Sequence, residues 1–212
     1  VRQAHDATHH LIGVTGIVFL ISLFFPWWGI DLGSGFGTAS NSGFDYLLTG
    51  LLPLLLVTDA RLEAAGPGGS RTIPAAAFWT GYRQTALRPD ELLVAIRIPL
   101  VPGRRVLFRK IGTRRAEAIA KVIVALAWRD DGSPEAPQPA MVGPLRDVRV
   151  ALGSVAPRPI RAPRTEALLE GGLPGRELAE RAAATVREEI SPIDDVRSTA
   201  AYRREVTGRV LR

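Results

Sequence analysis

The stretch from Phe108 to Trp128 most constrains the fold, because it holds two apolar runs on either side of a charged segment. It reads FRKIGTRRAEAIAKVIVALAW. A short apolar and basic run ends at Gly112, and a strongly apolar run follows over Val122 to Trp128. Apolar runs of this length, bounded by turn residues and rich in β-branched side chains, predict two strands of a sheet.

The same stretch holds both lysines of the protein. Lys110 and Lys121 lie in it, whereas the other 25 of the 27 basic residues are arginine. Lysine is a compact point charge and arginine a planar fork, so the two are not interchangeable at a selective site. We interpret the pair as an indication that this segment requires a compact cation. Chance placement in an arginine-rich chain is the alternative.

Composition excludes several classes of site. The net charge is +6 and the pI about 10.6, but the arginines are interleaved with acidic residues and form no dense basic run. This pattern favours a solvated surface over a nucleic-acid interface. The chain has no cysteine, which excludes disulfides, zinc ribbons and cysteine-bound iron–sulfur clusters within it.

The first 57 residues are more apolar and carry fewer charges than the rest of the chain. Leu11 to Trp28 carries no charge over 18 residues, long enough for a helix of about 27 Å, and ends in two tryptophans. We therefore predict a membrane helix over residues 11–28, with a signal peptide as the alternative. A second apolar run, Leu47 to Val57, has 11 residues and is too short to span a bilayer. Residues 1–57 resemble a fragment of a small multi-span membrane protein.

Beyond residue 57 the pattern predicts an α+β fold. A hairpin is expected from the strands Asp59–Ala64 and Arg71–Pro74, which flank Gly66-Pro67-Gly68-Gly69. Leu92 to Ile98 alternates, with Val94, Ile96 and Ile98 on one face of a half-buried strand. Three further strands are expected at about 105–112, 122–129 and 148–155.

Three helices complete the expected fold. Two are predicted over Arg164–Glu170 and Arg176–Ile190, the second with apolar residues every four positions. Ser198 is the expected N-cap of a last helix. Asp194 and Asp195 precede it, which favours helix capping over acid–base catalysis.

Nucleophilic and metal chemistry find little support. No histidine follows His10 and there is no cysteine, which disfavours hydrolases of the triad kind. His5, His9 and His10 have the spacing of a helix face, but no third ligand of the right kind stands nearby, so no metal site is predicted.

Four collinear segments carry a family resemblance. The loop FRKIGTRRAEAIAKV is similar to that of the FAD-binding (medium) subunits of molybdenum hydroxylases, the xanthine dehydrogenase and carbon monoxide dehydrogenase group. Three further segments agree in order: FWTGYRQTALRPDELLVAIRIP, VRVALGSVAPRPIRA and ISPIDDVRSTAAYRREVTGRVLR. The resemblance covers about Thr58 to Arg212, and four segments in one order are more specific than any single motif.

The resemblance implies a division of the chain and a set of partners. Residues 58–100 would be the C-terminal remnant of an FAD-binding domain. Residues 101–212 would form a carbon monoxide dehydrogenase flavoprotein-like C-terminal domain, a three-stranded antiparallel sheet packed on helices. The cofactor would be FAD, and the partners a molybdopterin-binding large subunit and an iron–sulfur small subunit. Electrons would pass through FAD to NAD or another acceptor, in a cytoplasmic complex unless residues 11–28 insert into a membrane.

The resemblance also places candidate cofactor-binding residues. Leu93 and Lys110 match positions that contact the isoalloxazine ring, where a lysine can stabilise the anionic reduced flavin. The segment 111–121 matches a loop near the flavin. The full set is Tyr82, Leu93, Lys110, Arg114, Glu117 and Lys121. The alternative is that the lysines are solvated and Leu93 is an ordinary core residue.

One departure from the family pattern concerns the pyrophosphate. The family carries a Gly-Gly-rich loop in its N-terminal half, and this chain has none. We therefore expect a join between unrelated sequences near residues 50–60, and weak or absent FAD binding. The competing function is a membrane-tethered, non-catalytic docking protein that does not bind FAD.

Overall fold

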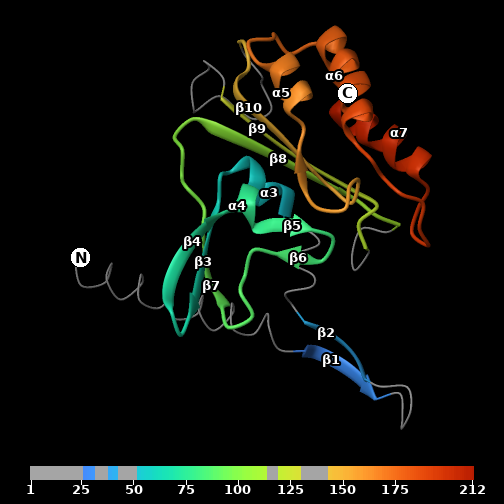
Figure 1. Cartoon of the computed structure of the whole chain (residues 1–212). Helices are drawn as coiled ribbons and strands as arrows, with labels where there is room; N and C mark the ends of the chain where they lie inside the picture. Colours follow the sequence, from blue (N-terminus) through green and yellow to red (C-terminus); the bar gives the residue numbers. More distant parts are fainter. Residues whose placement is uncertain (1–25, 32–37, 43–51, 114–118, 130–142) are drawn as a thin grey trace, which may run out of the picture.

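The computed structural model describes residues 26–31, 38–42, 52–113, 119–129 and 143–212 (Figure 1). Within the range 52–212 the elements form two units, one before and one after the segment near residue 100. Ahead of them, β1 (Pro26–Asp31) pairs antiparallel with β2 (Thr38–Ser42). The α+β class expected from the sequence is therefore present.

The first unit is built on a small antiparallel sheet. The sheet has the order β4-β3-β7 and comprises β3 (Arg61–Gly66), β4 (Gly69–Pro74) and β7 (Leu92–Arg97). The expected hairpin is confirmed, with Gly66 opposite Gly69 at its turn. The other elements of this unit are α3 (Leu52–Val57), α4 (Ala75–Phe78), β5 (Trp79–Gly81) and β6 (Gln84–Thr85).

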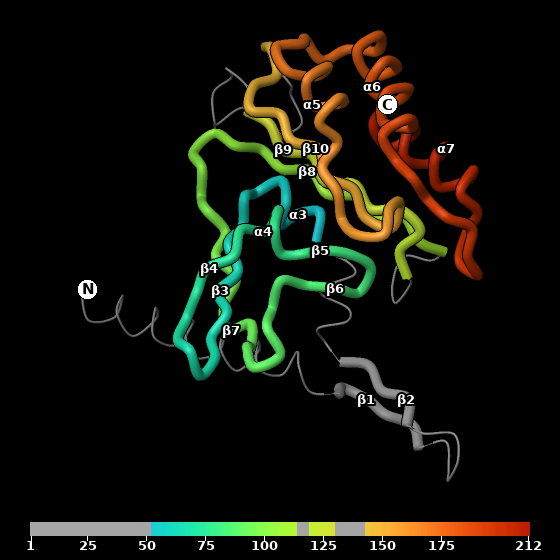
Figure 2. Tube along the Cα trace, viewed as in Figure 1, coloured from blue at the N-terminus to red at the C-terminus, as the bar shows by residue number. Residues whose placement is uncertain are grey.

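The second unit is a four-stranded antiparallel sheet with the order β11-β10-β9-β8. Its strands are β8 (Arg104–Ile111), β9 (Val122–Arg129), β10 (Arg146–Gly153) and β11 (Ile160–Arg161). Three of these strands were expected, and the two-residue β11 adds a fourth. Helices α5 (Pro163–Leu169), α6 (Arg176–Glu189) and α7 (Ala200–Leu211) cover one face, and α3 of the first unit lies on the other (Figure 2).

The two faces of this sheet can be followed along β9. Val122, Val124 and Trp128 belong to the apolar cluster that includes residues of α5 and α6. Ala125 and Ala127 belong to the cluster that includes α3. Because side chains alternate along a strand, every residue of β8 and β10 that pairs with β9 can be assigned to the helix face or to the α3 face.

The strand β7 departs from simple alternation. Leu62 pairs with Ile96 and Ala64 pairs with Leu93, so the register shifts by one residue and leaves Val94 as a bulge. Leu93 is 4% exposed, whereas Val94 is 44% exposed. The bulge places Leu93 and Ile96 on the core side, and the expected common face for Val94, Ile96 and Ile98 is therefore wrong.

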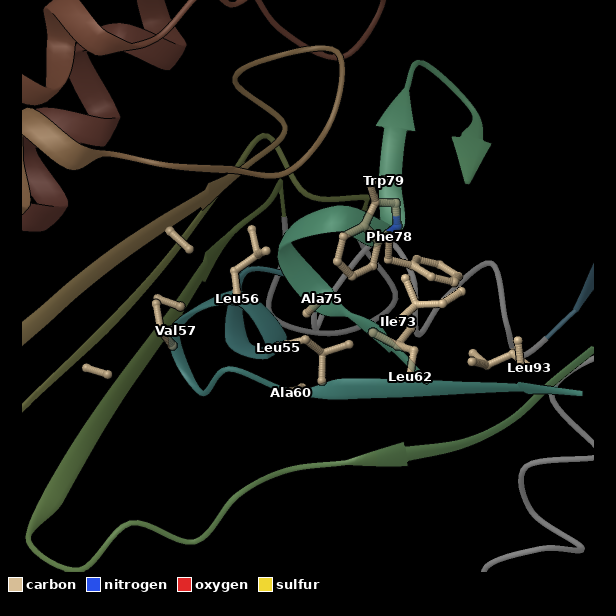
Figure 3. Packing of buried hydrophobic residues seen from close by; sticks show 14 residues of the cluster. Leu55, Leu56, Val57, Ala60, Leu62, Ile73, Ala75, Phe78, Trp79 and Leu93 are labelled. Carbon is tan, nitrogen blue, oxygen red and sulfur yellow. The ribbon is translucent and has the colours of Figure 1, made fainter. Parts of the chain in front are cut away.

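The helix α3 joins the two units. Leu55, Leu56 and Val57 are buried in a cluster with Leu62 of β3 and Phe78 of α4 (Figure 3). On its other side α3 contacts β9 and β10 of the second unit. Gly153 permits this approach, because a Cβ added there would lie 3.0 Å from Cγ of Pro53 and 3.3 Å from Cβ of Ile123.

A group of charged side chains accompanies this contact. Nη2 of Arg104 donates to Oδ2 of Asp147 at 2.7 Å, and Arg149 donates to Oδ1 of Asp147 through Nε at 3.1 Å. Arg149 also binds the carboxylate of Asp59, which follows α3. The four residues therefore link the end of α3 to β8 and β10, and we call them the seam network.

The helical layer is held by long-range capping. The carboxylate of Glu189, the last residue of α6, accepts hydrogen bonds from the backbone N–H of Arg164 at 2.6 Å and of Thr165 at 2.8 Å. These are free N–H groups of the first turn of α5, which need an acceptor. The last helix, α7, is capped by Thr199, whose Oγ1 accepts from the N–H of Tyr202 at 3.2 Å. The prediction of Ser198 as its N-cap is off by one residue.

The capping role expected for the acidic pair before α7 is confirmed. Oδ1 of Asp194 accepts from the N–H of Ala200 at 2.5 Å. Oδ1 of Asp195 accepts from the N–H of Arg197 at 2.9 Å and from Nη2 of Arg203 at 2.6 Å. The Arg203 guanidinium is the main cause of the lowered pKa of Asp195.

The membrane helix expected at residues 11–28 is not found in the described part of that range. Residues 11–25 lie outside the described residues, and residues 26–28 belong to β1 instead of the end of a helix. Pro26 disfavours the interior of a helix at this point, because proline has no N–H to donate to the helical hydrogen bonds. Residues 52–57 form a buried helix of the first unit and not a fragment of a membrane helix. In the described part of the chain, no helix is both long and apolar enough to cross a bilayer.

The contact at Gly153 gives a test of the seam. We expect Gly153→Ala to lower the free energy of unfolding by about 1–3 kcal/mol, because Pro53 and Ile123 cannot both move away from the added methyl group. Gly68→Ala is the matched control, since a Cβ there meets nothing within 4 Å. Urea unfolding of the three proteins measures the difference, and equal loss in both variants would contradict the close approach of α3.

The seam network gives a second test. Asp147 has a positive φ of 50°, which asparagine also tolerates, so Asp147→Asn removes the charge and keeps the backbone. Because the Arg104 side chain is only 7% exposed, loss of its partner should cost about 1–3 kcal/mol. Glu180→Gln, in an exposed pair on α6, should cost at most about 0.5 kcal/mol. Thermal or urea unfolding distinguishes the two, and equal effects would show that the network is no stronger than a surface pair.

Candidate functional site

Lys110 lies on β8 on the α3 face of the four-stranded sheet. It pairs with Ile123 of β9, which in turn pairs with Gly153 of β10, so the three form one row across the strands. Pro53 of α3 packs on this row. Lys110 is exposed, and no hydrogen bond or ion pair to it is present among the described residues. It therefore provides an uncompensated positive charge at the border between the two units.

The neighbour of Lys110 in the chain lies on the opposite face. Arg109 pairs with Val124, which belongs to the cluster under the helices. Both side chains are exposed cations, and they are separated by the thickness of the sheet. Lys110, not Arg109, is thus placed toward the first unit.

Leu93 is a core residue of the first unit. It is 4% exposed and belongs to the cluster formed with α3 and α4. Figure 3 shows it at the end of this cluster opposite Val57. Leu93 and Lys110 belong to different sheets, since β7 lies in the sheet of the first unit and β8 at the edge of the four-stranded sheet. This placement agrees with the alternative that Leu93 is an ordinary core residue.

The remaining expected site residues are dispersed. Tyr82 lies in the turn between β5 and β6, is 67% exposed, and its ring is 5.5 Å from the guanidinium of Arg83. Lys121 precedes β9, and its Nζ lies 5.1 Å from the ring centroid of Tyr202 on α7. It therefore reaches the helical layer, away from Lys110. Arg114 and Glu117 lie outside the described residues.

A separate cavity of about 260 Å³ lies at the tip of the first unit. Gly66, Gly69, Arg71, Arg88 and Glu91 are among its lining residues. Arg71 donates to both carboxylate oxygens of Glu91, at 2.6 and 2.7 Å, and the N–H of Arg88 donates to Glu91 at 2.8 Å. The Arg71 hydrogen bond, followed by that from Arg88, lowers the pKa of Glu91 to about 2. The charged lining residues are Arg71, Arg88, Asp90 and Glu91, whose charges sum to zero, so the cavity offers no net positive charge for a phosphate.

Comparison with known proteins identifies both units. Residues 46–101 match the FAD binding domain in molybdopterin dehydrogenase, and residues 108–212 match the CO dehydrogenase flavoprotein C-terminal domain. The boundary between the matches falls at the segment that joins β7 to β8. The first match begins at residue 46, so it includes the whole apolar run from Leu47 to Val57, which the sequence assigned to the membrane-like segment.

Curated relatives agree with this assignment. The chain is 30% identical to the glyceraldehyde dehydrogenase medium chain of Sulfolobus acidocaldarius over 156 residues, 73% of this chain and 52% of that protein. It is 30% identical to the carbon monoxide dehydrogenase medium chain of Afipia carboxidovorans over 164 residues, 75% of this chain and 52% of that protein. The chain spans about half the length of these relatives.

A solved structure shows the same fold. The structure of carbon monoxide dehydrogenase from Hydrogenophaga pseudoflava matches with a TM-score of 0.68 at 28% identity, covering 80% of this chain and 57% of that one. Fold and matches together define a class, the C-terminal part of a flavoprotein subunit of the molybdopterin dehydrogenases. Residues 46–212 belong to the family of FAD-binding medium subunits of the xanthine and carbon monoxide dehydrogenases.

The described residues fit one part of FAD better than another. The ammonium of Lys110 is exposed and has no ion-pair partner among the described residues, which suits the edge of the isoalloxazine ring that becomes negative on reduction. For the pyrophosphate, the glycine turn at residues 66–69 joins two antiparallel strands, and a strand, not a helix, follows it directly. It thus lacks the loop-to-helix geometry of a phosphate site. The described residues therefore include an exposed lysine as a candidate for contact with the flavin edge, and their glycine turn at residues 66–69 is not a pyrophosphate loop.

Sequence reasoning did not single out two features that matter here. Tyr202 contacts Lys121 from α7, and the seam network joins residues between 59 and 149. For this region the sequence indicated only a last helix that begins near Ser198. Contacts between residues so far apart in the chain have no signal in a single sequence.

The Arg71–Glu91 pair predicts a pH dependence. Because the pKa of folded Glu91 is about 2, below its ordinary 4.5, the pair stabilises the fold fully above about pH 4.5, and this contribution is lost as pH falls toward 2. Glu91→Gln should therefore lower stability at pH 7, and the gap to the parent should narrow between about pH 4.5 and 2. Urea unfolding across this range is the measurement. If the stabilities of the parent and of Glu91→Gln change in parallel with pH, the pair with Arg71 does not lower the pKa of Glu91.

Proposed function

We propose that this chain provides the flavin-edge part of the FAD-binding subunit of a molybdenum hydroxylase. One observation carries the proposal: Lys110 is an exposed cation, without an ion-pair partner among the described residues, on the sheet face that meets the FAD-binding unit. Family membership of residues 46–212 supports FAD as the cofactor.

The residues of this chain have distinct roles in the proposal. Lys110 would contact the flavin edge and stabilise negative charge there, which raises the reduction potential. Helix α3 and the seam network would hold the two units so that this face of the sheet stays toward the cofactor. Leu93 would support the site from the core, and Tyr82, exposed on its turn, would border it. Bound FAD would supply the chemistry that accepts electrons and passes them to an acceptor.

The wider complex follows from the relatives. They include medium chains of glyceraldehyde and carbon monoxide dehydrogenases and an FAD-binding subunit of xanthine dehydrogenase. We infer a molybdopterin-binding large subunit and an iron–sulfur small subunit as partners, with NAD as one candidate acceptor. The absence of cysteine in this chain agrees with iron–sulfur centres on a partner.

Flavin binding tests the proposal directly. The full chain is titrated with oxidised FAD, and the quenching of flavin fluorescence gives the dissociation constant of the oxidised form. A redox titration of the bound flavin gives its two-electron potential, and the two values together give the affinity for reduced FAD. Lys110→Met should weaken binding of reduced FAD about tenfold, the loss of one charge-assisted contact, and lower the two-electron potential by about 30 mV. Arg109→Met is the matched control, because it removes an equally exposed cation from the other face of the same strand.

The two outcomes have different meanings. Equal effects of both variants would show that only net charge matters and would remove Lys110 from the site. A folded chain that binds no FAD, alone or with its partners, would instead favour the docking protein that does not bind the cofactor.

A further inference from the structure

We propose that Tyr202 is a positioning residue for the flavin-facing strand. From α7 it holds Lys121, and through Lys121 it holds the end of β8 that carries Lys110. The inference rests on the proposed function in one respect, namely that Lys110 contacts the flavin.

The first link is the contact between the ring and the cation. Nζ of Lys121 lies 5.1 Å from the centroid of the Tyr202 ring. An ammonium within about 6 Å of an aromatic face is attracted by the negative charge of the ring. Lys121 is partly buried and Tyr202 is 42% exposed, so the contact lies at the edge of the helical layer. A compact ammonium at this position agrees with the selective use of lysine in an arginine-rich chain.

The second link is in the backbone. The N–H of Lys121 donates to the carbonyl of Ile111 at 2.8 Å, immediately beyond the last pair of the β8–β9 ladder, Ile111 with Val122. Lys110 is the residue before Ile111. The anchor on Lys121 thus fixes the backbone one residue away from the proposed flavin contact.

Tyr202 is itself held firmly. Its N–H donates to the capping Oγ1 of Thr199 at 3.2 Å. The next residue, Arg203, is 5% exposed and donates to Asp195 at 2.6 Å, which ties the start of α7 to the segment before it. Val206 and Val210 pack on the cluster under the helices. The first turn of α7 is therefore a fixed point, and Lys121 is the group that it restrains.

Packing alone does not require a tyrosine at this place. The buried residues of α7 are Arg203, Thr207 and Gly208, and Tyr202 is not among them. The ring contact with Lys121 is the side-chain interaction of Tyr202 that the described residues show. Its role is to restrain the lysine and not to fill the core.

Hydrogen exchange of one amide tests the restraint without any cofactor. In the full chain, Tyr202→Leu should raise the exchange rate of the Lys121 amide about twofold to fivefold, the equivalent of an exposed cation–π contact. Tyr202→Phe keeps the aromatic face and should restore the parent rate. Val196→Ala is the control, because Val196 lies in the segment before α7 and is fully exposed. No difference between Tyr202→Leu and the parent would overturn the inference.

FAD binding tests the connection to the flavin with the same variants. Tyr202→Leu should weaken binding of reduced FAD, and Tyr202→Phe should not. Faster exchange with unchanged FAD binding would overturn the positioning role toward the flavin. If Tyr202→Leu speeds exchange of the Lys121 amide but the parent chain itself binds no FAD, the proposed function is overturned. The restraint of Lys121 by Tyr202 would still stand.

Discussion

The close approach of α3 to the four-stranded sheet is the contact on which the arrangement of the two units depends. A helix of six residues is far too short to be stable by itself in water. It forms because Leu55, Leu56 and Val57 are buried between the hairpin sheet and β9 and β10, each burial contributing about 1.5–3 kcal/mol. Gly153 sets the distance, since any side chain at that point would displace Pro53.

Apolar packing is non-directional, and the seam network supplies the direction. Its four charged residues come from three separate stretches of the chain and pair with one another only when α3 lies in its observed position. They are Asp59, Arg104, Asp147 and Arg149. Nε and Nη1 of Arg104 are buried without a hydrogen-bond partner, so the pairing with Asp147 compensates only part of the desolvation of this side chain. Such a group adds little net stability, but it penalises any other placement of α3.

The sequence predicted regular elements better than contacts. The ranges of β9, α5 and α6 followed from periodicity and turn residues, which are local signals. The bulge at Val94 did not, because it depends on which residue of β3 lies opposite. Residues 52–57 were grouped with the membrane-like segment, because hydrophobicity alone does not distinguish a buried helix from part of a membrane helix. Lys110 was identified by resemblance, whereas its face of the sheet became known only from the pairing with Ile123. The burial of Leu93 follows from the bulge and could not have been deduced from alternation.

The two lysines, treated together in the sequence, have separate positions in the structure. Lys110 faces the first unit, and Lys121 reaches α7 in the helical layer. Lys121 is joined to the residue after Lys110 by a backbone hydrogen bond at the end of the β8–β9 ladder, from the N–H of Lys121 to the carbonyl of Ile111. The β8–β9 pair is therefore the element that connects the helical layer to the sheet face that we propose to lie toward the flavin. A shift of α7 reaches Lys110 through this bond and the strand pair, because side chains on opposite faces of a sheet cannot touch.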